Sequence, residues 1–330
     1  MLLLSLLPGL LAFCTCVARA QSRTAPPAGA TVVRRSGTQV GEFSTISAAA
    51  ASLPNDGSAR VIFIYPGTYT EQVHLTRNGK LTIMGYTTNT MSFADNQVSL
   101  TSVEGTISAT LRIDQNNVAV YNIDVVNNFG PHTASGAQAL AVAGYGTNLG
   151  FYAVRLFGYQ DTLRAEKGVQ FYGLCYIEGA VDFIFGQNGH AFFHRNTIAS
   201  VDAGAITADG PDTTTESLFV INESTITQST AATRSLTGLV FLGRPWSAQA
   251  QVAYISCNLG AVINSAGWEI WSTATPNTAN VLFAEFNSTG VGATGTRASF
   301  STKLPSAAGF GIADVLGANW TSWVDATYFT

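Results

Sequence analysis

The chain carries a short pattern three times, as Tyr152-Ala-Val-Arg-Leu156, Tyr172-Gly-Leu-Cys-Tyr176 and Phe193-His-Arg-Asn-Thr197. The first residues of these segments lie 20 and 21 positions apart. A period near twenty with several short strands in each period is typical of a stacked solenoid. In a parallel β-helix, each coil lies one strand spacing, about 4.8 Å, from the next. The pattern therefore favours a parallel β-helix.

The rest of the chain shows the same strand-and-turn chemistry. Short runs rich in Val, Ile, Phe and Tyr are separated by Gly, Asn and Asp. These runs are Val61–Tyr65, Leu81–Gly85, Val118–Val126, Phe151–Phe157, Phe171–Ile177, Ala191–Ile198, Ser217–Ile221, Leu239–Leu242, Val252–Ser256 and Val281–Phe286. Only the alanine-rich segment Thr45–Leu53 is predicted to be helical. We therefore expect an all-β, single-stranded solenoid.

A β-sandwich built from hairpins every 8–12 residues is the competing fold. Such hairpins favour Asn-Gly turns. The chain has this dipeptide only at Asn78-Gly79 and Asn188-Gly189. The scarcity of hairpin turns favours the β-helix.

Charged residues are unusually few in this chain of 330 residues. It has 16 Lys+Arg and 20 Asp+Glu, which is 11% of the chain, against about 25% in an ordinary soluble domain. With 46% hydrophobic and only 11% charged residues, the composition excludes intrinsic disorder and also a long coiled coil, which would be rich in Glu and Lys as well as Ala. A net charge of −4 with three lysines argues against a nucleic-acid partner, because phosphate binding needs clustered cations.

The amino terminus has the features of a secretory signal peptide. Residues Leu2–Val17 are almost wholly apolar, and Ala18-Arg19-Ala20 supplies a small-x-small cleavage site. The run is shorter than the ~20 residues of a membrane helix, although an uncleaved anchor is the alternative. We expect a signal peptide over residues 1–20, one catalytic domain over residues 21–330, and a secreted protein with no membrane contact after cleavage. Loss of Arg19 removes one positive charge, so the net charge of −4 becomes −5.

Secretion also bears on glycosylation and on the cysteines. Three sequons, at Asn222, Asn287 and Asn319, fit a secreted glycoprotein. Cleavage would leave two cysteines, Cys175 and Cys257, which are 82 residues or about four coils apart. Four strand spacings approach 20 Å, whereas a disulfide needs Cα atoms within ~7 Å. We predict two free, buried thiols.

Four polar residues interrupt apolar segments at the spacing of the coil. Gln138 and Gln160 are 22 residues apart, and Asp161 and Asp182 are 21 residues apart. A coil of about 21 residues would therefore stack these side chains on successive rungs. Two carboxyl groups so close together favour one protonated and one ionised member, which can serve as acid and nucleophile. Carboxamide N–H groups can stabilise an oxyanion, so the cluster suits acyl transfer at a carbonyl. The alternative is that these residues cap turns or form structural ladders.

Arg244 lies in the apolar segment Leu242-Gly-Arg-Pro-Trp246. A buried arginine needs a carboxylate partner, and its planar fork holds that partner rigidly. Trp246, Trp268 and Trp271 are candidates for stacking on sugar rings, with core packing as the alternative for each.

Taken together, these segments make the chain similar to the pectin methylesterases (pectinesterases), which act on plant cell-wall pectin. Five blocks match the family pattern in its order, and Gly267-Trp268 matches a weaker sixth. The five are Gly67-Thr-Tyr69-Thr-Glu71, Gln138-Ala-Leu-Ala-Val, Gly158-Tyr-Gln-Asp-Thr-Leu163, Asp182-Phe-Ile-Phe-Gly186 and Leu242-Gly-Arg-Pro-Trp246. The short leader looks more like the fungal branch of the family than the plant branch. The resemblance implies a right-handed parallel β-helix that needs no metal or organic cofactor.

The resemblance also implies a role for each site residue. Asp182 would be the nucleophile, Asp161 the general acid and then base, and Gln138 the main oxyanion donor. Gln160 would assist Gln138, and Arg244 would pair with and orient Asp182. The residues implied to contact the sugar are Trp246, Trp268 and Tyr159. The implied substrate is methyl-esterified homogalacturonan, and we expect a monomer.

Two positions depart from the family pattern. Val291 replaces a proline that the family often has in Asn287-Ser-Thr-Gly-Val-Gly-Ala293. Plant members pair the position of Cys175 with a cysteine some twenty residues on, where this chain has Asn196 or its neighbours. The second departure supports free thiols.

Other activities of the same fold are weaker hypotheses. A pectate lyase would need a Ca²⁺ cluster, and the only nearby acidic pair, in Asp209-Gly-Pro-Asp212, is interpreted as a turn. A galacturonan hydrolase would need an acid and base around the glycosidic bond. A non-catalytic pectin-binding protein would not need an acid–nucleophile set. No Gly-x-Ser-x-Gly segment marks a serine esterase, and His190 and His194 would lie ~13 Å apart on one strand, too far to share a metal.

Overall fold

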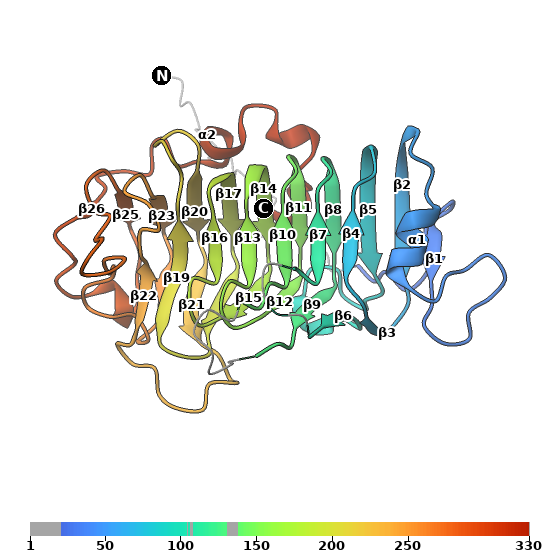
Figure 1. Cartoon of the computed structure of the whole chain (residues 1–330), viewed down its shortest axis with the longest axis horizontal. Helices are drawn as coiled ribbons and strands as arrows, with labels where there is room; N and C mark the ends of the chain where they lie inside the picture. Colours follow the sequence, from blue (N-terminus) through green and yellow to red (C-terminus); the bar gives the residue numbers. More distant parts are fainter. Residues whose placement is uncertain (1–20, 104, 106–107, 131–137, 330) are drawn as a thin grey trace, which may run out of the picture.

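The computed structural model describes residues 21–103, 105, 108–130 and 138–329. The predicted signal peptide lies outside them. The described strands form three parallel sheets that wrap around one elongated core (Figure 1). We name the sheets back, front and lower after their places in Figure 1. Neighbouring strands pair in parallel, as β10 with β13 and β14 with β17, which confirms the predicted parallel β-helix.

The described residues give the back sheet eleven strands. In spatial order they are β1 (Thr31–Val33), β2 (Gly57–Ile64), β5 (Gly79–Gly85), β8 (Val118–Tyr121), β11 (Leu149–Tyr152), β14 (Lys167–Gly173), β17 (Asn188–His194), β20 (Leu218–Asn222), β23 (Gln251–Ile255), β25 (Leu282–Phe286) and β26 (Ser301–Lys303).

Within the described part of the chain, the front sheet has seven strands and the lower sheet has eight. The front strands are β22 (Val240–Gly243), β19 (Gly204–Asp209), β16 (Ile184–Gly186), β13 (Leu163–Ala165), β10 (Val142–Gly144), β7 (Leu111–Ile113) and β4 (Val73–Leu75). The lower strands are β24 (Asn258–Leu259), β21 (Thr225–Gln228), β18 (Thr197–Ser200), β15 (Tyr176–Gly179), β12 (Arg155–Phe157), β9 (Asp124–Asn127), β6 (Val98–Ser102) and β3 (Gly67–Thr70).

The coil length is 21 residues in the middle of the chain, as expected. Val142 pairs with Leu163, which pairs with Ile184. The sequence pattern aligns Tyr152 with Tyr172, which is wrong by one residue: in the structure, Phe151 pairs with Tyr172. Stacked rings explain this register: Phe151 lies 4.9 Å from Tyr172, and Tyr172 lies 4.6 Å from Phe193, between ring centroids in the core. The register of the coils is therefore held by aromatic contacts between successive rungs.

Several predicted strands are in fact two strands that meet at a corner. The run Phe151–Phe157, for example, is divided into β11 and β12 by Ala153, whose φ is 48°. A single left-handed residue turns the chain from the back sheet to the lower sheet, which hydrophobicity alone does not reveal. We call these positions the left-handed corner; its residues are Asn122, Ala153, Leu174, Arg195, Glu223, Ser256 and Asn287. Corner amides continue the ladder, as Ala153 N donates to Gly173 O.

Helices are few and cover surfaces that the sheets leave open. The predicted helix forms as α1 (Ile46–Ser52), capped by Thr45 Oγ1, which accepts from Ala48 N at 3.2 Å. The remaining helices are η1 (Phe93–Asp95), η2 (Val291–Ala293), α2 (Ile312–Leu316), η3 (Trp320–Ser322) and η4 (Ala326–Tyr328). The segment from α2 onward packs on the outer face of the back sheet (Figure 1). No helix of the described residues is long and apolar enough to cross a membrane.

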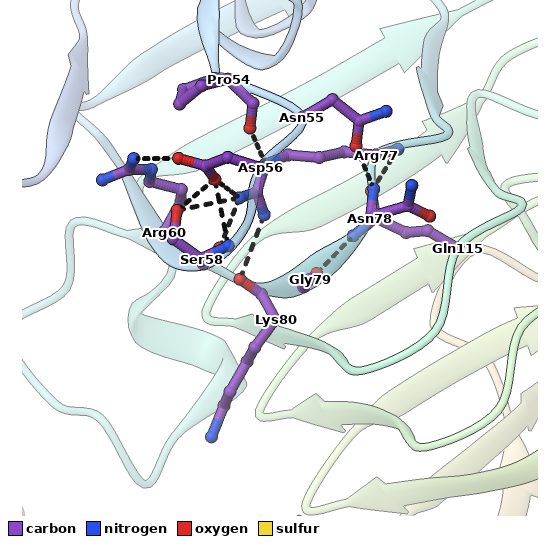
Figure 2. A network of polar contacts seen from close by, with 10 residues as sticks. All are labelled: Pro54, Asn55, Asp56, Ser58, Arg60, Arg77, Asn78, Gly79, Lys80 and Gln115. Atoms are coloured by element: carbon purple, nitrogen blue, oxygen red, sulfur yellow. Dashed lines mark hydrogen bonds and ion pairs between the residues drawn. The ribbon is translucent and has the colours of Figure 1, made fainter.

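Arg77 ties the loop after α1 to the turn between β4 and β5 (Figure 2). Its side chain is only 7% exposed, and its Nε donates to Pro54 O at 2.8 Å. Its Nη2 donates to Ser58 O and pairs with Asp56. A buried guanidinium shared among three carbonyl and carboxylate groups holds this loop against the coil.

Cys175 and Cys257 are free and buried, as predicted. Burial raises the pKa of each thiol to about 12, so neither is a ready nucleophile. They lie three coils apart rather than four, because Asn196 and Ser224 occupy the intervening rungs. Asn196 Oδ1 accepts from Cys175 N at 2.6 Å.

Candidate active site

Asp161 and Asp182 occupy the same position on adjacent coils, immediately before β13 and β16. The backbone bridge between Gln160 and Val181 sets this register, and Asp161 N donates to Val181 O at 3.1 Å. Both aspartates have left-handed backbones, with φ of 62° and 51°. Asp is among the few residues that tolerate this conformation. The 21-residue spacing thus brings the two carboxyl groups together, as the sequence predicts.

The two aspartates open into a cavity of about 220 Å³ on the outer face of the front sheet. Polar groups at its base come from the carboxyl pair and two carboxamides, and aromatic rings form its walls. The lining residues are Gln138, Gln160, Asp161, Asp182, Phe185, Ala208, Trp246 and Trp271.

Burial and charge separate the two carboxyl groups chemically. Asp161 is 5% exposed, and burial together with the neighbouring Asp182 raises its pKa to about 7. Burial also raises the pKa of Asp182, but Arg244 opposes this effect with a bidentate pair at 2.8 and 2.7 Å. Asp182 is therefore the ionised member of the pair, and Asp161 is the member that holds a proton near neutral pH.

The amides and Arg244 complete the polar wall. Gln138 Nε2 donates to Asp161 Oδ2, and Gln160 lines the same cavity. Arg244 follows β22, and its N donates to Thr207 O at 3.0 Å on β19. The Arg244 guanidinium lies 4.5 Å from the centroid of the Trp271 ring. Its plane is thus fixed by an aromatic face as well as by Asp182.

Of the two tryptophans that the resemblance places beside the sugar, Trp246 lines the cavity and Trp268 does not. Trp268 is 1% exposed; its ring stacks on Phe283 at 4.3 Å, and its Nε1 donates to Glu285 at 3.3 Å. The expectation that Trp268 flanks the sugar is therefore wrong, because its ring lies in the core. Trp271 takes the place beside the cavity, together with Trp246.

The different positions of Trp268 and Trp246 predict different effects for substitutions at the two residues. Trp268→Ala is expected to lower the free energy of unfolding by about 3–5 kcal/mol, the usual cost of removing a large buried aromatic ring. Trp246→Ala, at a half-buried position, is expected to cost much less stability and to raise KM instead. Urea unfolding and steady-state kinetics of both variants check this. Equal losses of stability would contradict the assignment.

Tyr159 lies outside the cavity. Its hydroxyl donates to Asp202 at 3.1 Å, and Asp202 also pairs with Arg234. The expectation that Tyr159 contacts the sugar in this cavity is corrected accordingly. Its neighbour Gln160 reaches the cavity because successive residues of an extended segment point to opposite sides.

Sequence reasoning missed Phe185, Ala208 and Glu269. Phe185 pairs with Ala208 across β16 and β19, and both line the cavity. Strand alternation within β16 was the signal that could have found Phe185. Glu269 follows Trp268, whose bridge to Gly243 sets Glu269 beside Arg244. Burial raises the pKa of Glu269, and Arg244 opposes that rise.

The segment Asp209-Gly-Pro-Asp212 is interpreted from its sequence as a turn, but Asp209 is the last residue of strand β19 and is fully buried. Its carboxylate accepts from Ser217 Oγ at 2.6 Å and from Gln251 N at 2.7 Å. Its main-chain oxygen accepts from Trp246 N at 3.0 Å. Asp209 thus holds both ends of the loop that carries Trp246, and burial raises its pKa to about 7.

Among the described residues, no group of three His, Cys, Asp or Glu side chains could hold a metal ion. The carboxyl, carboxamide and guanidinium groups at the cavity come from the coils of β10, β13, β16 and β22.

Comparison with known proteins identifies the family. A model of the pectinesterase family matches residues 30–305. This chain belongs to the pectinesterase family. A pectinesterase of Aspergillus aculeatus is 43% identical over 94% of this chain and 96% of the relative, and one of Aspergillus niger is 41% identical over 94% and 95%. The chain is thus a carboxylic ester hydrolase.

Solved pectinesterases share the fold. The deglycosylated pectin methylesterase of Aspergillus niger superposes with a TM-score of 0.84 at 36% identity, over 93% of this chain and all of the other. The enzyme from carrot superposes with a TM-score of 0.79 at 26% identity, over 94% of this chain and 98% of the other. The fold is therefore the right-handed parallel β-helix of the pectinesterases.

Proposed function

We propose that this pectinesterase hydrolyses the C6 methyl esters of homogalacturonan, giving methanol and pectate. The observation that carries the proposal is that Asp182, bound by the Arg244 guanidinium, and Asp161, whose pKa burial raises to about 7, open into one cavity. Both carboxyl groups open into a space walled by aromatic rings, which suits a sugar ring.

In the first half of the reaction, Asp182 attacks the ester carbonyl and forms an acyl-enzyme anhydride. The negative charge that develops on the carbonyl oxygen is stabilised by the N–H groups of Gln138 and Gln160. The C–O bond to the methoxyl group breaks, and Asp161 donates its proton to the departing methanol. Arg244 keeps the Asp182 carboxylate in the attacking orientation.

In the second half, the ionised Asp161 removes a proton from water, which attacks the acyl carbon. The bond to Asp182 breaks, Asp182 leaves as a carboxylate, and the sugar is left with a free carboxylic acid. Asp161 is reprotonated by the attacking water. One water is consumed, and the product acid loses its proton to solvent above its own pKa. Trp246 and Trp271, with Phe185, would hold the sugar over the carboxyl pair.

Secretion, a monomeric state and glycosylation are parts of the same proposal. Residues 1–20 would direct secretion and be removed, and residues 21–330 would act outside the cell as a monomer, without a cofactor. Asn287 and Asn319 are exposed and open to glycosylation. Asn222 ends β20 and accepts from His194 Nδ1 through its Oδ1 at 2.7 Å, so we expect its sequon to stay unmodified.

Methanol release from highly methyl-esterified pectin tests the activity. We expect one methanol and one titratable acid for each ester cleaved, with no new reducing ends and no unsaturated product. Reducing ends or absorbance of an unsaturated uronide, without methanol, would reject the proposal in favour of a hydrolase or a lyase.

A further inference from the structure

A row of outward-facing side chains crosses the front sheet from the cavity toward the N-terminal coils. Backbone pairing fixes the order of this row along the solenoid axis, one residue from each strand. The row runs Ala208, Phe185, Arg164, Ala143, Arg112 and His74. Ala208 and Phe185 line the cavity, so Arg164 is the first residue of the row beyond it.

Arg164 and Arg112 share one geometry. Each binds a carboxylate two residues further along its own chain, Arg164 to Glu166 and Arg112 to Asp114. In both pairs the arginine uses its Nε. Among the described residues, no hydrogen bond of either pair of Nη atoms is found, and the side chains are 17% and 42% exposed.

Tyr145 lies between the two arginines. The guanidinium of Arg112 lies 4.6 Å from the centroid of its ring, and that of Arg164 lies 5.4 Å away. Arg164 also lies 5.6 Å from the ring of Phe185. Stacked on aromatic faces and bound through Nε, each guanidinium is held in place with its Nη edge open. A preorganised donor loses little entropy when an anion binds.

The open edges suit one kind of ligand. Two parallel N–H groups of a guanidinium match a carboxylate, which binds them bidentately. Arg112 and Arg164 are two strand spacings apart, about 9.6 Å, along the axis of the row. A polymer with repeated carboxylates that leaves the cavity along the front sheet would pass both. The opposite side of the cavity carries Glu269 beside Arg244, so free carboxylates are disfavoured there.

We propose that Arg164, Tyr145 and Arg112 form a carboxylate-binding strip for de-esterified galacturonate residues next to the ester under attack. This deepens the proposed function and rests on it for the identity of the polymer. The strip places the free-acid part of the chain on the N-terminal side of the cavity and the esterified part toward Glu269. A chain so oriented is demethylated beside residues that are already free acids.

Binding of an unesterified hexagalacturonate tests the strip without any turnover. Isothermal titration calorimetry of Arg164→Gln is expected to show affinity weaker than wild type by on the order of tenfold. Arg112→Gln is expected to weaken binding less, because the side chain is more exposed. Arg195→Gln is the matched control: this exposed arginine also pairs with a carboxylate, Glu223, but lies at the left-handed corner, away from the front sheet.

A second variant separates ligand binding from mere support of the fold. Glu166→Gln keeps a carboxamide oxygen that can accept from Arg164 Nε and hold the guanidinium in place, but it removes the negative charge that repels a carboxylate ligand. Hexagalacturonate is therefore expected to bind several-fold more tightly. A purely structural salt bridge would give weaker or unchanged binding. The strip is overturned if Arg164→Gln binds like wild type, if Arg195→Gln loses as much affinity, or if Glu166→Gln binds no more tightly. If the wild-type protein binds hexagalacturonate through these residues but releases no methanol from pectin, the proposed methyl-ester hydrolysis is rejected and the carboxylate-binding strip is retained.

Discussion

Asp182→Asn is expected to reduce the rate of methanol release by about 10⁴-fold or more, the scale seen when a catalytic nucleophile is removed. The amide is nearly the same size as the carboxylate but cannot form the acyl-enzyme. Asn also tolerates the left-handed backbone at this position, where φ is 51°. The variant should therefore fold, so that the loss reports chemistry rather than unfolding. Steady-state methanol release on esterified pectin measures the effect.

Glu223→Gln serves as the matched control for this variant. It also removes the carboxylate partner of an arginine, Arg195, but the pair is exposed and distant from the cavity. Its activity should equal that of wild type. If Asp182→Asn keeps activity within tenfold of wild type and has an unchanged melting temperature, the assignment of Asp182 as nucleophile is wrong.

The second large effect concerns stability and pH. Asp161 and Asp209 are buried, and the pKa of each is raised to about 7 in the native protein, against about 3.9 for an unfolded aspartate. Between about pH 4 and pH 7 the native state therefore binds protons that the unfolded state has released. The free energy of unfolding should fall as pH rises through this window, by several kcal/mol in total, and then level off.

Asp161→Asn and Asp209→Asn should each flatten that fall, because each removes one of the two protons. His190 and His194 are among the groups that act in the opposite direction: burial lowers the pKa of each, so their effect is to raise stability with pH. Comparing each variant with wild type isolates the carboxyl effect from the histidine effect. Urea unfolding at intervals from pH 4.5 to 8 provides the measurement.

Asp212→Asn provides the control for these variants, because Asp212 lies three residues after Asp209 but its side chain is exposed to solvent. We expect its curve to follow that of wild type at every pH. Variants of Asp161 and Asp209 whose unfolding free energies run parallel to wild type across the window would contradict the buried-proton account.

Spacing alone predicts the part of the site that belongs to regular coils. The 21-residue interval between Asp161 and Asp182 equals the coil length, so the two carboxyl groups meet wherever the coils stack in register. Arg244 was identified because a cation in an apolar segment needs a partner. These inferences hold because a parallel ladder converts sequence distance directly into spatial position.

The errors occur where the chain leaves that ladder. Trp268 and Trp271 belong to a segment that meets β22 through isolated bridges rather than as a regular strand, so no period tells which ring turns inward. Tyr159 points away because Asp202, on another coil, accepts its hydroxyl. The corner at Ala153 depends on one backbone angle, φ, which the pattern of hydrophobic residues does not predict.

The connections between the front and back sheets differ greatly in length from coil to coil. Between β13 and β14 the connection is Glu166 alone, and between β16 and β17 it is Gln187 alone. Between β22 and β23 it is the segment 244–250, which begins with Arg244 and includes Trp246. The left-handed corner keeps its place in these coils, so none of this added length falls between the back and lower sheets.

The solenoid thus divides its coils into a constant part and a part open to insertion. A longer connection between the front and back sheets leaves the aromatic stack and the corner ladder untouched. Arg244, which binds Asp182, and Trp246, whose ring lines the cavity, both come from such an insertion. New specificities in this architecture can therefore arise by lengthening a connection, without any change in the residues that fold the core.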